Sequence, residues 1–231
     1  MTGSGTAPPT LLPHGSTVDR ALRQLRSRIL LGQVLPGEQI RQEEMAAELG
    51  VSRVPLREAL RVLAQEGLLQ HERNRGYFVA KRGLHQLAQI HLMLHHLETA
   101  LMRTIGWPDE PLLRELAELN EEMRGVVERP DWTPLLALNR RFHFAIFQLS
   151  PLDVIRQEVE RLWIMAEPYL SARLALLEVR RQTIHEHAAL LDALRARDRA
   201  ASISLLDRHR EKTYPEPPLV EQAGLGELEA P

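Results

Sequence analysis

A run of twenty residues, GVSRVPLREALRVLAQEGLL at positions 50–69, constrains the fold more than any other part of the chain. Ser52 lies just before an apolar pattern of helical period, where a small hydroxyl residue caps a helix. Arg53, Arg57 and Arg61 recur every four residues, so they share one face of that helix while the leucines occupy the other face. The run therefore predicts a helix with one packing face and one face suited to anions or base edges. The apolar positions of the pattern are Val54, Leu56, Leu60 and Leu63.

The segments on either side of this helix complete a recognisable supersecondary pattern. A short amphipathic helix over 43–49 is expected to end at Gly50, because glycine readily takes the left-handed conformation of a helix C-cap. Another amphipathic helix is expected over 17–32. After Gly67, two short apolar segments flank residues 71–76, where asparagine, glycine and arginines predict the turn of a β-hairpin. Three helices and a hairpin make a winged helix-turn-helix.

The distribution of charge agrees with a nucleic-acid-binding role for this part of the chain. Residues 16–83 carry twelve Arg or Lys against eight Asp or Glu, a net charge of +4, whereas the whole chain of 231 residues has a net charge of −2. Positive charge thus concentrates in the segment that would contact phosphates, as counterion release requires. The alternative is that the arginines form only a solvated helix face.

From residue 84 to about 213 the sequence has helical periodicity throughout. Breaks are expected at Gly106-Trp107-Pro108, Arg129-Pro130 and Ser150-Pro151, and near Asp198. No segment alternates with a period of two residues, so about six helices are expected. The predicted fold class is mainly α, with an N-terminal winged helix-turn-helix followed by an antiparallel α-helical bundle.

The two ends and the overall composition limit the class of protein. Residues 1–15 lack the pattern of a signal peptide and are expected to form a flexible arm, and residues 214–231 hold four prolines and two glycines, which predicts a disordered tail. Cysteine is absent, so disulfide frameworks and thiolate metal sites are excluded. No apolar stretch approaches the roughly 18 residues that span a membrane. These features are consistent with a cytoplasmic protein that has no membrane partner.

Histidines supply the chemistry of the helical half. Asn139 and His143 are four residues apart, so an amide oxygen and an imidazole share one helix face, and His187 and His209 belong to two later helices. Imidazole binds Zn, Ni, Cu and Fe, and ligands from facing helices can meet in a bundle core. A histidine-lined polar core without metal is the alternative. Glu186 is expected to point away from the ligand face, and no HExxH spacing is present, which argues against a metalloenzyme.

The segments PGEQI, EEMAAELGVSRVPLREALRVLAQEGLL and RNRGYFVA together closely resemble the DNA-binding domain of FadR-like GntR-family bacterial transcription regulators, over about residues 16–82. The resemblance implies that Arg53 and Arg57 reach bases or phosphates in the major groove, and that the wing with Arg75 and Gly76 enters the minor groove. The residue after Arg53 is a valine where the family often has threonine, so it can touch a thymine methyl but cannot donate a hydrogen bond. The DNA-contacting residues expected are Ser52, Arg53, Val54, Arg57, Arg73, Arg75 and Gly76.

Residues 84–213 are similar to the FCD domain that FadR-like regulators carry, an all-α effector-binding and dimer-supporting domain. The resemblance implies a divalent metal, expected to be Zn with Ni or another transition metal as alternatives. The family commonly has aspartate where this chain has Asn139, so the site loses one formal charge. Many relatives also have an arginine where this chain has Leu94. The expected metal ligands are Asn139, His143, His187 and His209, and the expected contacts to an effector are Arg161 and Arg173.

The function implied is that of a ligand-responsive DNA-binding regulator and not of an enzyme. A homodimer would place two recognition helices on a pseudo-palindromic operator. A small organic acid bound at the metal would release the DNA, which makes the protein a repressor. Two alternatives stay open, namely a regulator for which the metal itself is the signal and, less favoured, a metalloenzyme.

Overall fold

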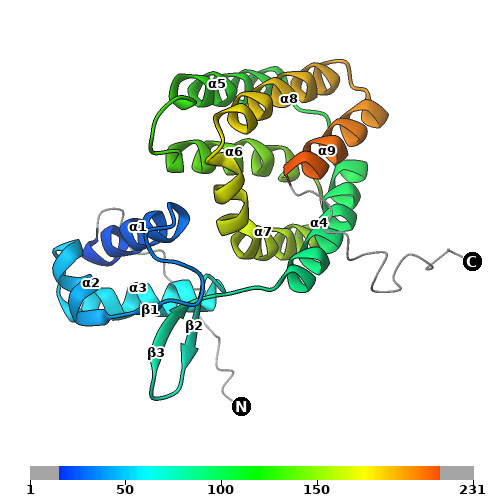
Figure 1. The fold of residues 1–231 in the computed structure, drawn as a ribbon. Coiled ribbons are helices and arrows are strands. Elements are labelled where there is room, and N and C mark those ends of the chain that lie inside the picture. The colour runs from blue at the N-terminus through cyan, green and yellow to red at the C-terminus, as the bar shows by residue number, and fades with distance from the viewer. Residues whose placement is uncertain (1–15, 214–231) are drawn as a thin grey trace, which may run out of the picture.

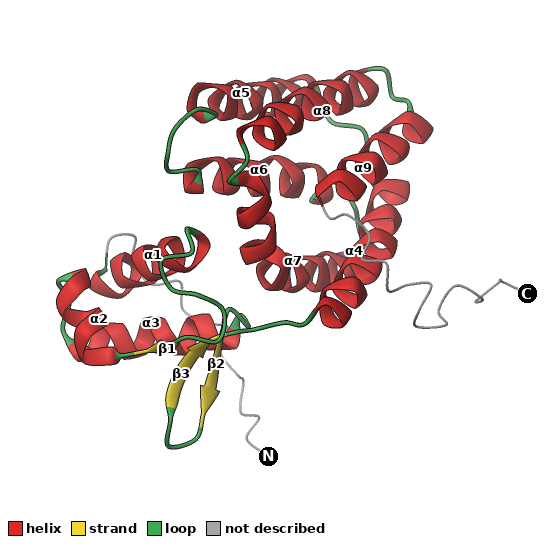
Figure 2. Cartoon of the chain, in the orientation of Figure 1, coloured by secondary structure: helices red, strands yellow, loops and turns green. Residues whose placement is uncertain are grey.

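The computed structural model describes residues 16–213. The arm expected at residues 1–15 and the tail expected at 214–231 lie outside the described residues. Within the described range, a winged helix-turn-helix precedes a set of six helices, so the fold is mainly α as the sequence predicts (Figures 1 and 2). No helix between residues 16 and 213 has a stretch long and apolar enough to cross a membrane.

Local capping signals explain the boundaries of the first helices. Ser16 caps α1 by accepting a hydrogen bond from the backbone N–H of Asp19 at 3.1 Å. Gly50 ends α2 with a φ of +61°, as the sequence predicts. Ser52 occupies the N-cap position of α3 but makes no capping hydrogen bond with its side chain, contrary to the expectation. The elements of this unit are α1 (Thr17–Leu30), β1 (Gln39–Ile40), α2 (Gln42–Leu49), α3 (Arg53–Gln65), β2 (Leu69–Glu72) and β3 (Gly76–Val79).

The wing is larger than the sequence predicts. The strands form an antiparallel sheet in the order β1-β3-β2, with Gln39 opposite Phe78 and Leu69 opposite Val79. The strands β2 and β3 extend further into the hairpin than expected, so its turn is shorter than the predicted range 71–76. The strand β1 was not predicted. The added strand ties the segment before α2 to the wing.

Six helices form the second unit, and four of the five breaks between them fall where the sequence predicts. The break between α7 and α8 was not predicted, because Ala175 and Leu176 offer no glycine or proline signal. The helix α5 packs on α6 and α8, while α4 packs on α7 and α9. The helices are α4 (Leu84–Thr104), α5 (Glu110–Val126), α6 (Thr133–Phe147), α7 (Asp153–Leu174), α8 (Leu177–Arg195) and α9 (Arg199–Thr213).

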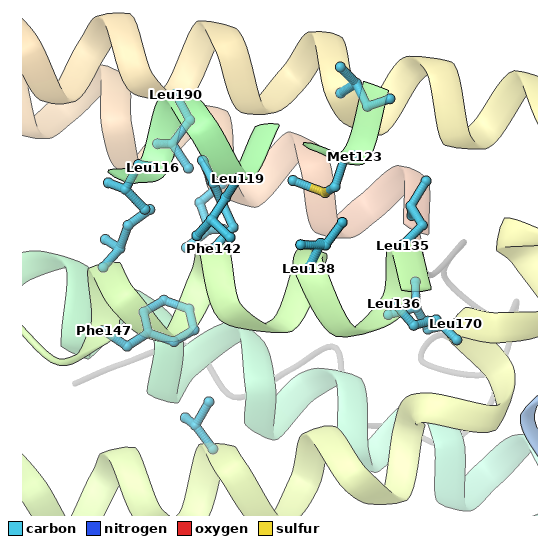
Figure 3. Close-up of a cluster of buried hydrophobic side chains, with 14 of the residues drawn as sticks. Leu116, Leu119, Met123, Leu135, Leu136, Leu138, Phe142, Phe147, Leu170 and Leu190 are labelled. Carbon is cyan, nitrogen blue, oxygen red and sulfur yellow. The ribbon is translucent and has the colours of Figure 1, made fainter. Parts of the chain in front are cut away.

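An apolar core fills the space between these helices. Leu116 and Met123 of α5 approach Leu138 and Phe142 of α6, and all four side chains are buried (Figure 3). Burying such side chains contributes about 1.5–3 kcal/mol each relative to leaving them in water. The winged unit has a separate core. Leu30 at the end of α1 is an exception, because it belongs to the core of the helical unit.

The two units meet where α1 reaches α7. Ser171 of α7 donates its hydroxyl hydrogen to the backbone carbonyl of Leu30 at 2.6 Å and accepts a hydrogen bond from Trp132 Nε1 at 2.9 Å. Tyr169 exchanges hydrogen bonds with the backbone of Arg82, in the segment that links the wing to α4. Figure 1 shows α7 changing direction, and Pro168 lies inside that helix, where it removes one backbone donor. The bent part of α7 is therefore the part that contacts the winged unit.

Candidate metal centre and nucleic-acid interface

The first turns of α3 present an exposed surface to solvent. Ser52, Arg53, Val54 and Arg57 are all exposed at the N-terminal end of this helix. Val54 belongs to the apolar pattern of the sequence but does not pack in the core, because it is 72% exposed while Leu56 is fully buried. The positive end of the helix dipole lies at the same place and favours phosphate. An apolar side chain between two arginines at a helix N-terminus suits a DNA groove, where a methyl contact and phosphate contacts occur together.

Two of the predicted DNA-contacting arginines, Arg53 and Arg75, have only weak partners within the protein. Arg53 Nη2 lies 2.5 Å from Glu43 Oε1, and both side chains are more than two thirds exposed. Arg75 pairs with Glu72 at the wing and lies over the ring of Phe78, 4.9 Å from its centroid. Exposed ion pairs contribute little stability, so both arginines can exchange their carboxylate partners for phosphates at small cost. Arg73 is exposed at the tip of the wing, and Gly76 begins β3 with a φ of +94°.

Three helices bring the three predicted histidines together. His143 of α6, His187 of α8 and His209 of α9 each offer a ring nitrogen, and these nitrogens all lie within 4.8 Å of one another. The Nε2 atoms of His143 and His187 are 3.1 Å apart. All three side chains are buried. Residues far apart in the sequence thus form one cluster in the core of the bundle.

The cluster has the donor chemistry that a transition metal requires. Two nitrogens bound to one ion at about 2.0–2.1 Å lie roughly 3–3.4 Å apart, close to the separation observed for the first two histidines. Burial lowers the pKa of His143 and of His187 well below the usual value, which keeps both rings neutral and able to bind metal. Asn139 Oδ1 is buried, and within residues 16–213 it has no hydrogen-bond partner. The amide lines the same cavity of about 20 Å³ as His143 and His209.

Glu186 does not point away from the histidines, contrary to the expectation from sequence. Its Oε2 atom lies 2.7 Å from Nδ1 of His209. The side chains of Glu186 and His209 are only 13% and 10% exposed, so this contact is mostly shielded from water. Glu186 directly precedes His187 in the sequence, but the histidine that it contacts lies on a different helix, α9.

A buried ion pair forms another wall of the cavity. Glu98 of α4 accepts a hydrogen bond from Trp163 Nε1 at 2.6 Å and pairs with Arg210 Nη1 at 2.8 Å. Burial raises the pKa of Glu98, and the positive charge of Arg210 acts in the opposite direction. A guanidinium from α9 thus reaches the buried carboxylate of α4, and Leu94 lies one turn before Glu98 on that helix. Sequence reasoning missed Arg210, although it directly follows His209.

Comparison with known proteins agrees with this architecture. The family model for bacterial regulatory proteins of the gntR family matches residues 17–79, and the model for the FCD domain matches residues 89–212. The chain belongs to the GntR family and carries an FCD domain. The boundary between the two matches lies between the wing and the first turns of α4.

Several transcription regulators are similar to this chain over most of their length. The transcriptional regulator McbR of Escherichia coli K12 is 29% identical, with 81% of this chain and 86% of the relative covered. The gluconate operon transcriptional repressor of Bacillus subtilis 168 is 27% identical, with 87% and 85% covered. The solved structure of E. coli McbR/YncC superposes with a TM-score of 0.70 at 26% identity, covering 85% of this chain and 94% of that chain. A GntR regulator from Rhodococcus sp. RHA1 gives a TM-score of 0.66 at 25% identity, covering 84% and 93%.

These findings establish the general activity. The protein is a DNA-binding transcription regulator, since both domain matches and the similar proteins are regulators and not enzymes. The FCD half contains a histidine cluster that could hold a metal ion. The fold of the two units follows that of GntR regulators.

The FCD domain does not bring the two predicted effector arginines to the histidines. Neither Arg161 nor Arg173 lines the cavity beside the cluster. Arg161 is exposed on α7 and pairs with Glu158, one turn away on the same helix. Arg173 lies beyond Pro168, near the end of α7. The cavity wall instead contains the guanidinium of Arg210.

Proposed function

We propose that this GntR regulator is a repressor that releases its operator when a small carboxylate binds at a metal centre in the FCD domain. The observation that carries the proposal is the convergence of His143, His187 and His209 beside a cavity that Asn139 also lines. A homodimer would present two copies of α3 to a pseudo-palindromic site. DNA contact would come from Ser52, Arg53, Val54 and Arg57, and from Arg73, Arg75 and Gly76 of the wing.

The metal proposed is Zn, with Ni or another borderline transition metal as alternatives. Asn139 and the three histidines would hold it, and an amide oxygen and imidazole nitrogens bind a metal as uncharged donors. A bound divalent ion would therefore keep its full formal charge, which favours an anionic effector at the remaining coordination positions. When bound, the metal would act as a Lewis acid that coordinates a carboxylate oxygen.

The helix α7 is the proposed connection between effector and DNA. The cavity of about 20 Å³ exceeds the roughly 10–15 Å³ that one water requires, but it is too small for a metabolite. Trp163 and Leu170 of α7 form part of its wall, and the next residue, Ser171, holds the carbonyl of Leu30. An effector that enters the cavity must displace part of this wall. Displacement of α7 would then favour a different position of the winged unit.

Operator binding with defined ligands tests this proposal. The full-length protein is loaded with Zn²⁺, and its affinity for the operator is measured by fluorescence anisotropy while small carboxylates are added one at a time. At least one carboxylate is expected to weaken operator binding by 5–150-fold, the range of about 1–3 kcal/mol that is typical of allosteric coupling. The loss of this response in His143→Ala, with operator binding retained, would link the effect to the histidine cluster. A complete absence of response to any carboxylate would refute the inducer role.

A second candidate function is direct sensing of the metal. The small volume of the cavity favours this alternative, since about 20 Å³ has room for a water-sized species but not for a metabolite. Removal of Zn²⁺ by a chelator would then change operator affinity in the absence of any carboxylate. For an organic-acid sensor, chelation alone is expected to leave operator affinity within a factor of about two. The same anisotropy assay therefore separates the two functions.

A further inference from the structure

His209 differs from the other two histidines of the cluster in the hydrogen bond at its Nδ1 atom. Glu186 Oε2 lies 2.7 Å from His209 Nδ1, a distance typical of a charge-assisted hydrogen bond. The Nδ1 atoms of His143 and His187 are buried, and within the described chain neither has a hydrogen-bond partner. One ligand of the three is therefore oriented by a carboxylate.

The carboxylate is itself fixed in position. Gln182 Nε2 donates a hydrogen bond to Glu186 Oε1 at 2.8 Å, and both residues lie on α8, one turn apart. The resulting chain of side chains runs from Gln182 through Glu186 to His209 on α9. Because both oxygens of Glu186 have partners, its carboxylate cannot rotate without losing one of two hydrogen bonds.

This contact determines which nitrogen of His209 can bind a metal. An ionised carboxylate can only accept a hydrogen bond, so the proton of a neutral His209 ring resides on Nδ1. The Nε2 atom then carries the lone pair. His209 also lines the cavity that Asn139 and His143 line, so the ring is held at the site.

Glu186 differs from the other acidic groups nearby in the kind of group that it contacts. Glu98 also lines the cavity, but it is paired with Arg210 at 2.8 Å, and Asp207 pairs with the same guanidinium. Their negative charges are therefore compensated by a cation. Glu186 contacts an imidazole that is itself a candidate metal ligand, so this carboxylate acts on the site directly.

We propose that Glu186, held by Gln182, is a positioning residue that orients His209 as a metal ligand. This inference rests on the metal centre of the proposed function. Carboxylates that hold a ligating histidine in this way typically improve metal affinity by about 10–100-fold. In this chain such support compensates in part for the amide at position 139.

The affinity of purified apoprotein for Zn²⁺ alone tests the inference, measured by competition with a chromogenic chelator. Glu186→Gln is expected to weaken Zn²⁺ binding by about tenfold and Glu186→Ala by up to about 100-fold. Glu178→Gln is the matched control, because Glu178 lies on the same helix but is exposed in its first turn. This control is expected to bind Zn²⁺ like the wild type.

Two further measurements separate a positioning role from a merely structural one. Thermal unfolding of the apoproteins reports any general damage, and the absorption bands of bound Co²⁺ report the geometry of the metal site. Altered Co²⁺ bands and weakened Zn²⁺ binding with an unchanged apoprotein melting temperature are the expected result. Equal Zn²⁺ affinity of the wild type and Glu186→Ala would overturn the role of Glu186 but not the metal centre of the proposed function. No Zn²⁺ binding by the wild type would overturn the metal centre of the proposed function and the inference with it.

Discussion

Replacing Ser171 by alanine is expected to weaken the junction between the two units of the protein. The serine is fully buried, donates to the carbonyl of Leu30 and accepts from the indole of Trp132. Leu30 is the last residue of α1, so its carbonyl belongs to the final turn, where helical carbonyls have no partner within the helix. The substitution leaves two groups without their hydrogen-bond partner, namely the buried carbonyl of Leu30 and the partly buried indole N–H of Trp132.

The size of the effect follows from these two lost partners. A buried polar group without a partner costs about 1–3 kcal/mol, and the indole N–H is only partly buried and can regain water. The loss in free energy of unfolding is therefore expected to be about 2–3 kcal/mol. For a chain of this size, each 1 kcal/mol shifts the melting temperature by about 2–4 °C, so a decrease of roughly 4–12 °C is expected.

Ser202→Ala provides a matched control. Ser202 is also buried, with 1% of its surface exposed, and among the described residues its hydroxyl donates only to the carbonyl of Asp198. That carbonyl also accepts the backbone N–H of residue 202, so the substitution leaves no buried group without a partner. Its effect is expected to stay below about 0.5 kcal/mol, because such bonds within a helix add little stability.

Differential scanning fluorimetry of the wild type and both variants, with operator anisotropy, measures the outcome. The junction is also the proposed route from the effector to the DNA, so Ser171→Ala is expected to reduce the response of operator binding to the effector as well. Equal melting temperatures of the two variants would refute the assignment of stability to this junction. A normal effector response in a destabilised Ser171→Ala variant would refute its role in coupling.

Further predictions concern the DNA-binding surface, the metal centre and two glycines. Arg57→Ala is expected to weaken operator binding by about 1–3 kcal/mol in a salt titration followed by anisotropy, while Arg114→Ala, an exposed change on α5, leaves it unchanged. Zn²⁺ at about 100 times its dissociation constant should stabilise the protein by about 2.7 kcal/mol, and His143→Ala should abolish the shift in melting temperature. Gly50→Ala should lower the free energy of unfolding by about 1–2 kcal/mol, since φ is +61° at that residue. Gly125→Ala inside α5 should raise it by about 0.5–1 kcal/mol. Equal effects of the two variants on urea unfolding would refute the argument from backbone conformation.

Sequence patterns predicted those features that local chemistry decides. The end of α2 at Gly50 and the start of α3 after Ser52 depend on a left-handed residue and on a small polar residue, and each is visible within one turn of chain. Most breaks between the FCD helices were predicted because proline and glycine mark them. The spacing of Asn139 and His143 likewise places both on one helix face without any knowledge of the fold.

Features that depend on contacts between distant segments were missed. The strand β1 has only two residues, and its pairing partner is almost forty residues away, so neither length nor alternation reveals it. The turn between α7 and α8 has no breaking residue and follows from the packing of both helices. The orientation of Glu186 depends on α9, which lies some twenty residues further along the chain. The same reason explains why Arg210 was missed as the partner of Glu98.

The position of Leu30 has a consequence for the exchange of domains between regulators of this kind. Its side chain is buried among the apolar residues of the FCD half, although it is the last residue of the first helix of the DNA-binding half. A chimera cut in the linker at residues 80–83 would keep every element whole and still separate this side chain from its packing partners. In a working chimera, residue 30 of the DNA-binding domain should therefore match the surface around Ser171 of the FCD domain. The two domains then have to be exchanged together with the residues that pack between them.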